Sequence, residues 1–205
     1  MIEQGTEEWF AQRLGKVTAS RVSDVMAKTK SGAGAGRKNY MMELLCQRLT
    51  GQREEGFTSA AMLRGIELEP VARSAYEIAT GDIVTEAGFV IHPEQPQTGA
   101  SPDGYVGLGG LIEIKCPNTA QHIAVLQSGC ADPKYVSQMQ HQMACTKALY
   151  CDFVSFDDRL PEALQIVIVR VERDEAFIAR MMSDINLFLQ ELDKLESDML
   201  KRMGL

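Results

Sequence analysis

Residues 101–115 read SPDGYVGLGGLIEIK, and this stretch decides the fold because a glycine-rich turn leads into a strand-like run of apolar residues. Successive side chains of a strand point to opposite faces, so Glu113 and Lys115 share one face. Ile112 and Ile114 share the other face, which anchors the strand in a core. The stretch therefore predicts a strand that presents an acid and an amine side by side.

Asp103 stands ahead of this strand, separated from it by a short extended segment and a turn with glycines at 107, 109 and 110. A hairpin that closes at the turn places Asp103 beside Glu113. Two converging carboxylates repel each other unless a cation lies between them, and such oxygen ligands suit Mg²⁺ or Mn²⁺. Glu69, on a preceding helix, would add a third carboxylate. Lys115 would orient or deprotonate a water molecule and offset charge on a phosphate.

The rest of the chain alternates between helical and strand periodicity. Helices are expected after a cap at Thr6, around Val25, and around Leu44 with Gly51 as the closing residue. Longer helices are expected over 58–80 (one helix, or two that meet near Pro70), 119–126, 133–149 and 174–203, the last capped by Asp174. Strands are expected over 83–91, 111–115, 150–156 and 164–172. The glycine-rich segment 29–38 lacks the GxxxxGK[ST] pattern of a phosphate-binding loop and is expected to be a mobile loop.

This order of elements predicts an α/β fold in which a small mixed central β-sheet is flanked by helices. The 205 residues are enough for a single domain with its own core. The expected parts of that domain are a helical N-terminal part (about 1–82), a sheet-containing core (about 83–172) and a C-terminal helix (about 174–203).

Hydrophobic residues make up 45% and charged residues 24% of the chain, as in ordinary soluble globular proteins. No apolar run approaches the roughly 20 residues that span a bilayer, and residues 1–13 lack the features of a secretory signal. Five cysteines without a framework spacing indicate a reduced protein without disulfides. We therefore expect a cytoplasmic protein with no membrane partner.

The net charge of −7 argues against a protein that grips nucleic acid through a broadly basic surface. The charge is unevenly distributed, because the segment from Arg13 to Arg53 holds nine Lys or Arg residues against two acids, Asp24 and Glu43. A solvated surface explains such a segment as well as a DNA contact does. Charge alone therefore assigns no partner.

His141, Cys145 and Cys151 are residue types that bind metals, but their spacing fits no standard zinc site. The cysteines between 116 and 151 also lack the clustered spacing of an iron–sulfur ligand set. A core role on a helix is the expected explanation for His141.

The turn at Asp103 and the pair Glu113 and Lys115 match, at this spacing, the PD-(D/E)xK nuclease pattern, whose core is restriction-endonuclease-like. Either half alone has little specificity. Further segments make the resemblance more specific. The matching segments, in chain order and with the two already named, are Trp9…Ser20, Gly65…Arg73, Ser101–Gly104, Glu113–Pro117 and Gln138–Gln140. With these segments the chain resembles the phage lambda exonuclease family, also described as YqaJ-type viral recombinases, from about residue 9 to residue 172.

The resemblance implies a Mg²⁺-dependent 5′→3′ exonuclease, with Mn²⁺ able to substitute and one or two ions per site. Such an enzyme degrades one strand of linear duplex DNA from 5′-phosphorylated ends to mononucleotides. It leaves 3′ single-stranded overhangs for recombination by strand annealing. The resemblance also implies a ring-shaped homotrimer around DNA, a single-strand annealing protein as partner, and a phage or prophage protein in a bacterial cell.

The resemblance assigns catalytic roles to five residues. Asp103 and Glu113 would bind the metal together with the Ile114 backbone carbonyl, and Glu69 would assist through a water molecule. Lys115 would position or activate the attacking water, and Gln138 would lie near the scissile phosphate.

The resemblance also assigns residues that contact DNA. Arg13, Ser20 and Ser101 would hold the terminal 5′-phosphate, and Lys30 in the basic segment would add a DNA contact. Met62 would be an apolar wedge that splits the terminal base pair, although helical spacing also fits a methionine in the core.

Three alternatives remain open on the sequence. One is a PD-(D/E)xK endonuclease, which would cut circular DNA because it needs no end. Another is a catalytically inactive DNA-binding module with the same fold, against which the intact set of Glu69, Asp103, Glu113 and Lys115 argues. The last is a small-molecule metalloenzyme, which the basic segment disfavours.

Overall fold

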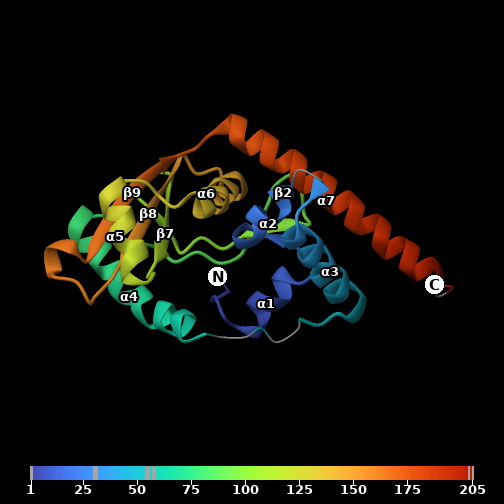
Figure 1. Cartoon of the computed structure of the whole chain (residues 1–205), viewed down its shortest axis with the longest axis horizontal. Helices are drawn as coiled ribbons and strands as arrows, with labels where there is room; N and C mark the ends of the chain where they lie inside the picture. Colours follow the sequence, from blue (N-terminus) through green and yellow to red (C-terminus); the bar gives the residue numbers. More distant parts are fainter. Residues whose placement is uncertain (1, 30–31, 54–55, 57–58, 203, 205) are drawn as a thin grey trace.

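The computed structural model describes residues 2–29, 32–53, 56, 59–202 and 204. Within these residues a mixed sheet has the strand order β6, β7, β8, β9. β7 is antiparallel to β6 and parallel to β8, and β9 is antiparallel to β8. The strands span Gly104–Val106, Gly110–Lys115, Tyr150–Phe156 and Ile166–Glu172. Helices flank this sheet (Figure 1), which confirms the predicted α/β class.

Helices cover both faces of this sheet, and the alternation along β7 decides which side chain meets which helix. Ile112 belongs to one apolar cluster with Tyr76 of α4 (Ala60–Thr80). On the opposite face, Leu111 belongs to a cluster with Met139 of α6 (Pro133–Thr146). Helices α5 (Thr119–Ser128) and α6 form the crossover that joins the parallel strands β7 and β8. Glu113 shares the face of Leu111 and therefore lies toward α6.

The N- and C-terminal helices gather in the other half of the molecule (Figure 1). They are α1 (Glu7–Arg13), α2 (Val22–Met26), α3 (Ala35–Thr50) and α7 (Glu175–Arg202). The rings of Tyr40 on α3 and Phe188 on α7 stack with their centroids 5.8 Å apart inside a shared apolar cluster. None of the helices in the described part of the chain has the length and apolar character that a membrane span requires.

Short strands and turns complete the chain. β1 (Val17–Thr18), β5 (Thr98–Ala100) and β4 (Val90–Ile91) form a small sheet in that order, and β2 (Lys28–Thr29) pairs with β3 (Gly32–Ala33). The 3-10 turns η1 and η2 cover Ala19–Arg21 and Glu162–Leu164.

Helix α6 joins the two halves. Its Met139 lies in the cluster under the sheet, while its Ala144 lies in the cluster of the terminal helices. Gln140 Nε2 donates a hydrogen bond to the Glu172 carbonyl (2.8 Å), and Gln140 Oε1 accepts one from the Asp174 N–H at the start of α7 (3.0 Å). The position of α6 relative to β7 is therefore fixed from both sides.

Local signals placed several helix ends correctly. Thr6 Oγ1 accepts a hydrogen bond from the Trp9 N–H (3.3 Å), and Asp174 Oδ1 accepts one from the Phe177 N–H (2.9 Å). Gly51 ends α3 in the left-handed region with φ of 67°. These caps satisfy backbone groups that a helix end leaves unpaired, and they depend on neighbouring residues alone.

Two predicted segments differ from the structure. Segment 29–38 is not a loop throughout, because α3 begins at Ala35 and Thr29 and Gly32 pair in a hairpin. Segment 83–91 is a strand only at Val90–Ile91, with one isolated bridge from Thr85 to Tyr105. Of the apolar residues that suggested a longer strand, Val84 packs in the cluster of α4, whereas Ile83 is exposed.

Of the two alternatives for segment 58–80, the structure shows the single helix: α4 runs through Pro70 without a break, and its apolar side packs on the sheet through Ala72 and Tyr76. One helix differs in detail from the prediction. α6 ends at Thr146 rather than near Leu149, because Lys147 takes a left-handed φ of 63°.

His141 on α6 gives the fold a predictable response to acid. Its side chain is fully buried, 2.9 Å from the Thr98 hydroxyl, and burial together with a smaller effect of His92 lowers its pKa to about 3. An unfolded chain protonates histidine near a pKa of about 6.5. Below that pH the unfolded state therefore binds a proton that the folded state refuses, and acid destabilises the fold.

Below about pH 6.5, His141 should lower the free energy of unfolding of the natural protein by about 1.4 kcal/mol for each unit that the pH falls. We expect the substitution His141→Gln to remove this contribution. Glutamine keeps a polar group near Thr98 but does not titrate. The free energy of unfolding of both proteins, measured by denaturant titration at about pH 7.5, 6 and 5, tests the expectation. Equal pH slopes for the two proteins would show that His141 is not buried in its neutral form.

Candidate active site

The hairpin of β6 and β7 brings Asp103 to Glu113, as the sequence predicted. Gly104 pairs with Ile112 in the antiparallel register. Asp103, directly before β6, therefore lies beside Glu113, the residue that follows Ile112 on β7. Asp103 Oδ2 accepts a hydrogen bond from the Ile114 N–H at 2.6 Å. A side chain at position 104 would clash, since its Cβ would lie 2.4 Å from Val84 Cγ1. Glycine there allows the hairpin to close against the preceding segment.

Glu113 is a fully buried carboxylate that is surrounded by donors. Its Oε1 accepts a hydrogen bond from Gln138 Nε2 (2.6 Å) and forms an ion pair with Lys115 Nζ. Its Oε2 accepts one from Gln142 Nε2 (2.6 Å). Both glutamines come from α6, one turn apart, so the helix that covers this face of the sheet also solvates its charge.

The charges at this site shift the pKa values of Asp103 and Lys115. Burial, with the adjacent Glu113, raises the pKa of Asp103 well above its ordinary value. Burial by itself would lower the pKa of Lys115, but Glu113 and Asp103 outweigh it and raise that pKa instead. Lys115 is therefore held as an ammonium ion, a form that orients a water molecule and offsets negative charge but does not accept a proton.

Glu69 is less closely integrated than the other acids. It lies on α4, where Arg73 Nη2 donates to its Oε1 at 2.9 Å, and Arg73 also pairs with Glu86. Within the described residues, no three His, Cys, Asp or Glu side chains form a ready metal-binding cluster. The structure thus brings Asp103, Glu113 and Lys115 together, while Glu69 remains paired with arginine.

The chemistry of this donor set fits a divalent cation. Asp103 is half-buried and Glu113 fully buried, and a cation between them would offset the repulsion that, after burial, raises the pKa of Asp103. In the described part of the chain Asp103 accepts a hydrogen bond on Oδ2 alone, which leaves Oδ1 for another ligand. Carboxylate and carbonyl oxygens are the ligands that Mg²⁺ prefers. Asp103 and Glu113, with the neighbouring Ile114 carbonyl, form such a set.

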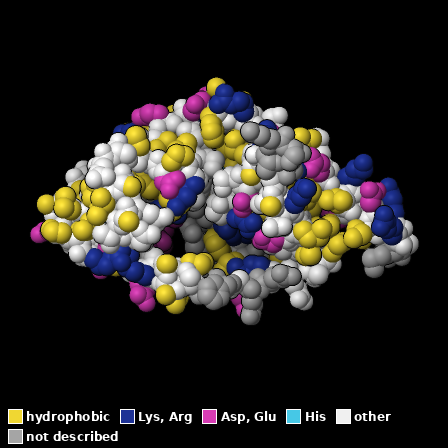
Figure 2. Space-filling model, in the orientation of Figure 1, with side chains coloured by type: hydrophobic (Ala, Val, Ile, Leu, Met, Phe, Trp, Pro, Cys, Tyr) yellow, Lys and Arg dark blue, Asp and Glu magenta, His cyan; other side chains and the backbone are white. Residues whose placement is uncertain are grey.

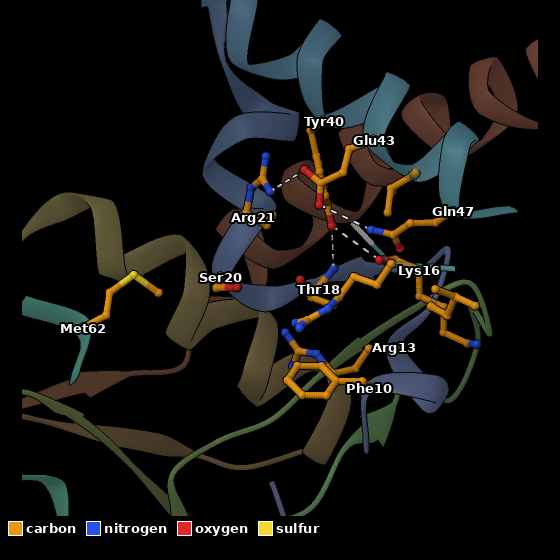
Figure 3. Close-up of a pocket in the computed structure, with 13 residues that line it drawn as sticks. Phe10, Arg13, Lys16, Thr18, Ser20, Arg21, Tyr40, Glu43, Gln47 and Met62 are labelled. Carbon is orange, nitrogen blue, oxygen red and sulfur yellow. Dashed lines mark hydrogen bonds and ion pairs between the residues drawn. The ribbon is translucent and has the colours of Figure 1, made fainter. Parts of the chain in front are cut away.

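A pocket of about 380 Å³ is connected to this site through Arg13, which contacts Ser101, and three of the predicted DNA contacts line the pocket (Figure 3). They are Arg13 of α1, Ser20 of η1 and Met62 of α4, with Met62 on the opposite side from the α3 residues. Met62 is 55% exposed, so the alternative of a core methionine does not hold. Lys30 lies outside the described residues.

The pocket is positively charged. Among the described residues, Arg13, Lys16, Arg21 and Arg53 line it with a single acid, Glu43. Arg21 is neutralised by Asp24 (2.6 Å) and Glu43 (2.8 Å). Figure 2 shows the molecule hollowed between its two halves, with Lys and Arg side chains inside the hollow. The basic segment seen in the sequence therefore includes a concave surface suited to an anion.

Arg13 is positioned by uncharged partners. Its Nη1 donates to Ser101 Oγ (3.1 Å), its guanidinium lies 4.0 Å from the Trp9 ring centroid, and within the described residues it makes no ion pair. Trp9 Nε1 also donates to Ser101 Oγ (3.0 Å). Burial lowers the pKa of Arg13 to about 10, Tyr40 raises it, and Arg53 lowers it further. Since Ser101 is two residues from Asp103, this contact ties the pocket to the carboxylates.

Sequence reasoning missed several residues of the site. Gln142 was missed although it follows Gln138 by one helical turn, which was the available signal. Arg53, whose guanidinium stacks 3.8 Å from the Phe10 ring centroid, and Lys16 were seen only as part of a basic segment. Arg64 was missed entirely; its Nη1 donates to the Pro117 carbonyl (3.4 Å) and holds α4 against the end of β7.

Comparisons with known proteins identify the family and the fold. The family described as "YqaJ-like viral recombinase domain" matches residues 8–149. An alkaline exonuclease from Laribacter hongkongensis, LHK-Exo, is 55% identical, with 97% of this chain and 98% of that chain covered and a TM-score of 0.91. Its complex with dAMP is similar to the same extent, with a TM-score of 0.92.

A more distant structure shares the fold. A phage-related exonuclease from Haemophilus somnus is 20% identical, with 90% of this chain and 96% of that chain covered and a TM-score of 0.71. No curated protein matches the chain.

The paired carboxylates predict a gain in stability when one charge is removed. We expect Asp103→Asn to unfold at a higher temperature than the natural protein in buffer without divalent cations. Asparagine still accepts the hydrogen bond from the Ile114 N–H but does not repel Glu113. Burial raises the pKa of Asp103 in the folded state. Above the ordinary pKa of 3.8 the unfolded chain therefore loses the Asp103 proton more readily than the folded protein does, and this destabilisation of the fold grows as pH rises. The gain is therefore larger at neutral pH than near pH 4, on the order of 1 kcal/mol or more.

Thermal unfolding with and without Mg²⁺ tests this expectation. A ligand that binds the folded state stabilises it, so Mg²⁺ should raise the Tm of the natural protein and leave that of Asp103→Asn unchanged. Glu172→Gln, an exposed acid on β9, is the matched control and should behave like the natural protein. If Asp103→Asn had a lower Tm than the natural protein in the absence of metal, repulsion between Asp103 and Glu113 would not be what destabilises the site.

Proposed function

Because the chain belongs to the YqaJ-like viral recombinase family, we propose that it is a phage-type exonuclease that uses Mg²⁺. In this proposal it degrades one strand of linear duplex DNA in the 5′→3′ direction from 5′-phosphorylated ends. The products are mononucleotides and 3′ single-stranded overhangs for recombination by strand annealing. The observation that carries the proposal is the half-buried Asp103 next to the buried Glu113, with Lys115 beside them and with a connection through Ser101 to a positive pocket.

The residues of the chain divide the proposed work between binding and chemistry. Mg²⁺ held by Asp103, Glu113 and the Ile114 carbonyl, with Glu69 through water, would supply Lewis-acid activation of the phosphate and the attacking water; Mn²⁺ would substitute. Lys115 keeps its proton on Nζ, orients that water and offsets negative charge on the phosphate.

Gln138 stands at the open side of this site. Its amide is bonded to Glu113 Oε1, and its side chain is partly exposed, so it can also contact a phosphate oxygen. The Oε1 atom of Glu113, which Gln138 and Lys115 contact, thus lies on the side from which the substrate would arrive.

The pocket would bind the terminal 5′-phosphate. Arg13 offers a planar fork of donors that suits the oxygens of a phosphate, and Ser20 and Ser101 add hydroxyl donors. Met62, exposed on the other side of the pocket, would press on the last base pair. The 55% identical LHK-Exo has been solved with dAMP, and deoxynucleoside monophosphates are the product class of the proposed reaction.

We propose one nuclease domain over residues 1–205 that acts as a ring-shaped homotrimer, alongside a single-strand annealing protein. The net charge of −7 supports the ring, because an acidic protein has little general attraction for DNA and enclosure would keep it on its substrate. Gel filtration that shows only monomers at working concentration would contradict the trimer.

The central test is cleavage of linear 5′-phosphorylated duplex DNA. We expect mononucleotide release with Mg²⁺ and none with EDTA or with the variant Glu113→Gln, while Glu172→Gln remains active. Lys115→Ala is expected to bind DNA but to cleave about 10²–10⁴-fold more slowly, since it loses the group that orients the water. Lys194→Ala, an exposed lysine on α7, is the control.

Substrate form separates this proposal from the alternatives. Cleavage of covalently closed circular DNA would identify an endonuclease instead. DNA binding without any cleavage in Mg²⁺ would identify an inactive binding module.

The pocket makes a separate prediction about the 5′ end. We expect faster digestion of 5′-phosphorylated than of 5′-hydroxyl ends, and loss of that preference in Arg13→Gln. Charge-assisted hydrogen bonds are worth about 1.5–3 kcal/mol, so the preference should be about 10- to 100-fold. Arg180→Gln, an exposed arginine on α7, should keep it. If Arg13→Gln slowed both substrates equally, Arg13 would support Ser101 rather than bind phosphate.

A further inference from the structure

Gln142 is a buried polar residue that the proposed reaction leaves without a role. It lies on α6 with a fully buried side chain, and its Nε2 donates to Glu113 Oε2 at 2.6 Å. Gln138, one turn earlier, is partly exposed and holds the other oxygen of the same carboxylate. The two glutamines therefore bind the two oxygens of Glu113 from different sides, and the side of Gln142 is closed to DNA.

The orientation of the Gln142 amide is fixed by chemistry. An ionised carboxylate accepts hydrogen bonds and donates none, so the NH₂ group of Gln142 must face Glu113. The amide oxygen then points away, and Gln142 Oε1 is buried without a hydrogen-bond partner among the described residues. A buried carbonyl without a partner costs free energy, and an apolar side chain of the same shape would avoid that cost.

Packing alone therefore does not explain a glutamine at this position. The neighbouring Gln140 shows what a structural glutamine on α6 looks like. Gln140 is 2% exposed, and both ends of its amide are satisfied by the backbone of Glu172 and Asp174. Gln142 instead leaves one end unpaired in order to hold Glu113.

We infer that Gln142 is a positioning residue for the metal site: it anchors Glu113 Oε2 so that Oε1, on the side of Lys115, is presented to the divalent cation. This inference rests on the proposed function, because it assumes that Asp103 and Glu113 hold the cation. Groups that orient a metal ligand without touching the metal commonly change metal affinity 10- to 100-fold when they are removed. Gln142 is such a group, and its removal leaves the carboxylate free to rotate.

The test is binding of Mn²⁺ alone to the full chain, measured by titration calorimetry. We expect Gln142→Met, which keeps the shape but not the donor, to weaken the Mn²⁺ Kd about 10- to 100-fold. Gln140→Met is the matched control: it should lower the Tm, since it loses two satisfied hydrogen bonds, and keep the Kd within about twofold of the natural value. Gln142→Asn, which is too short to reach Glu113, replaces Gln142→Met if that variant does not fold.

Cleavage at varied Mg²⁺ gives a second readout. For Gln142→Met the Mg²⁺ concentration at half-maximal rate should rise by the factor seen in Kd, kcat should recover at saturating Mg²⁺, and KM for DNA ends should stay unchanged. A Kd within about twofold of the natural value, or an equal loss in Gln140→Met, would overturn the inference while leaving the nuclease proposal standing. If the natural protein bound no Mn²⁺, or if Asp103→Asn bound Mn²⁺ as tightly as the natural protein does, both the nuclease proposal and the inference about Gln142 would fall.

Discussion

The burial of Glu113 is the constraint on which the rest of the site depends. A carboxylate removed from water is stable only where donors or cations replace the lost hydration. Lys115 comes from the same strand, but the amide donors come from α6, which must therefore lie across that face of the sheet at the right height. The crossover between β7 and β8 fixes this height, because the parallel pairing of the two strands sets where α6 can pass.

The same helix explains how the two halves of the molecule act as one. α6 packs under the sheet through Met139, against the terminal helices through Ala144, and on β5 through His141. The contact of Ser101 with Arg13 makes a second connection, from the segment before Asp103 to the first helix. The positive pocket is thereby connected to the two carboxyl groups, Asp103 and Glu113. This arrangement suits a phosphodiester that must be gripped at one end and hydrolysed close by.

Positive charge is concentrated in the pocket, although the protein as a whole is acidic. A net charge of −7 gives no general attraction for a polyanion, yet in the part of the chain that the structure describes the pocket gathers arginines and a lysine around a single acid. Arg13 and Arg53 are held over the rings of Trp9 and Phe10, and neither forms an ion pair with a carboxylate among the residues that the structure describes. Aromatic faces orient a guanidinium without neutralising it, so its hydrogen-bond donors stay available for an anion.

Periodicity, helix caps and one hairpin were legible in the sequence because each depends on residues close together in the chain. The hairpin that joins Asp103 to Glu113, the cap at Asp174 and the strand Tyr150–Phe156 are of this kind. The pairing of Glu69 with Arg73 is local too, because the two residues lie four apart on α4. Tertiary structure decided that α3 begins as early as Ala35, that most of 83–91 forms no strand, and that Gln142 reaches Glu113. Each of these depends on which distant surface a segment or side chain meets, and residues close together in the chain do not determine that contact.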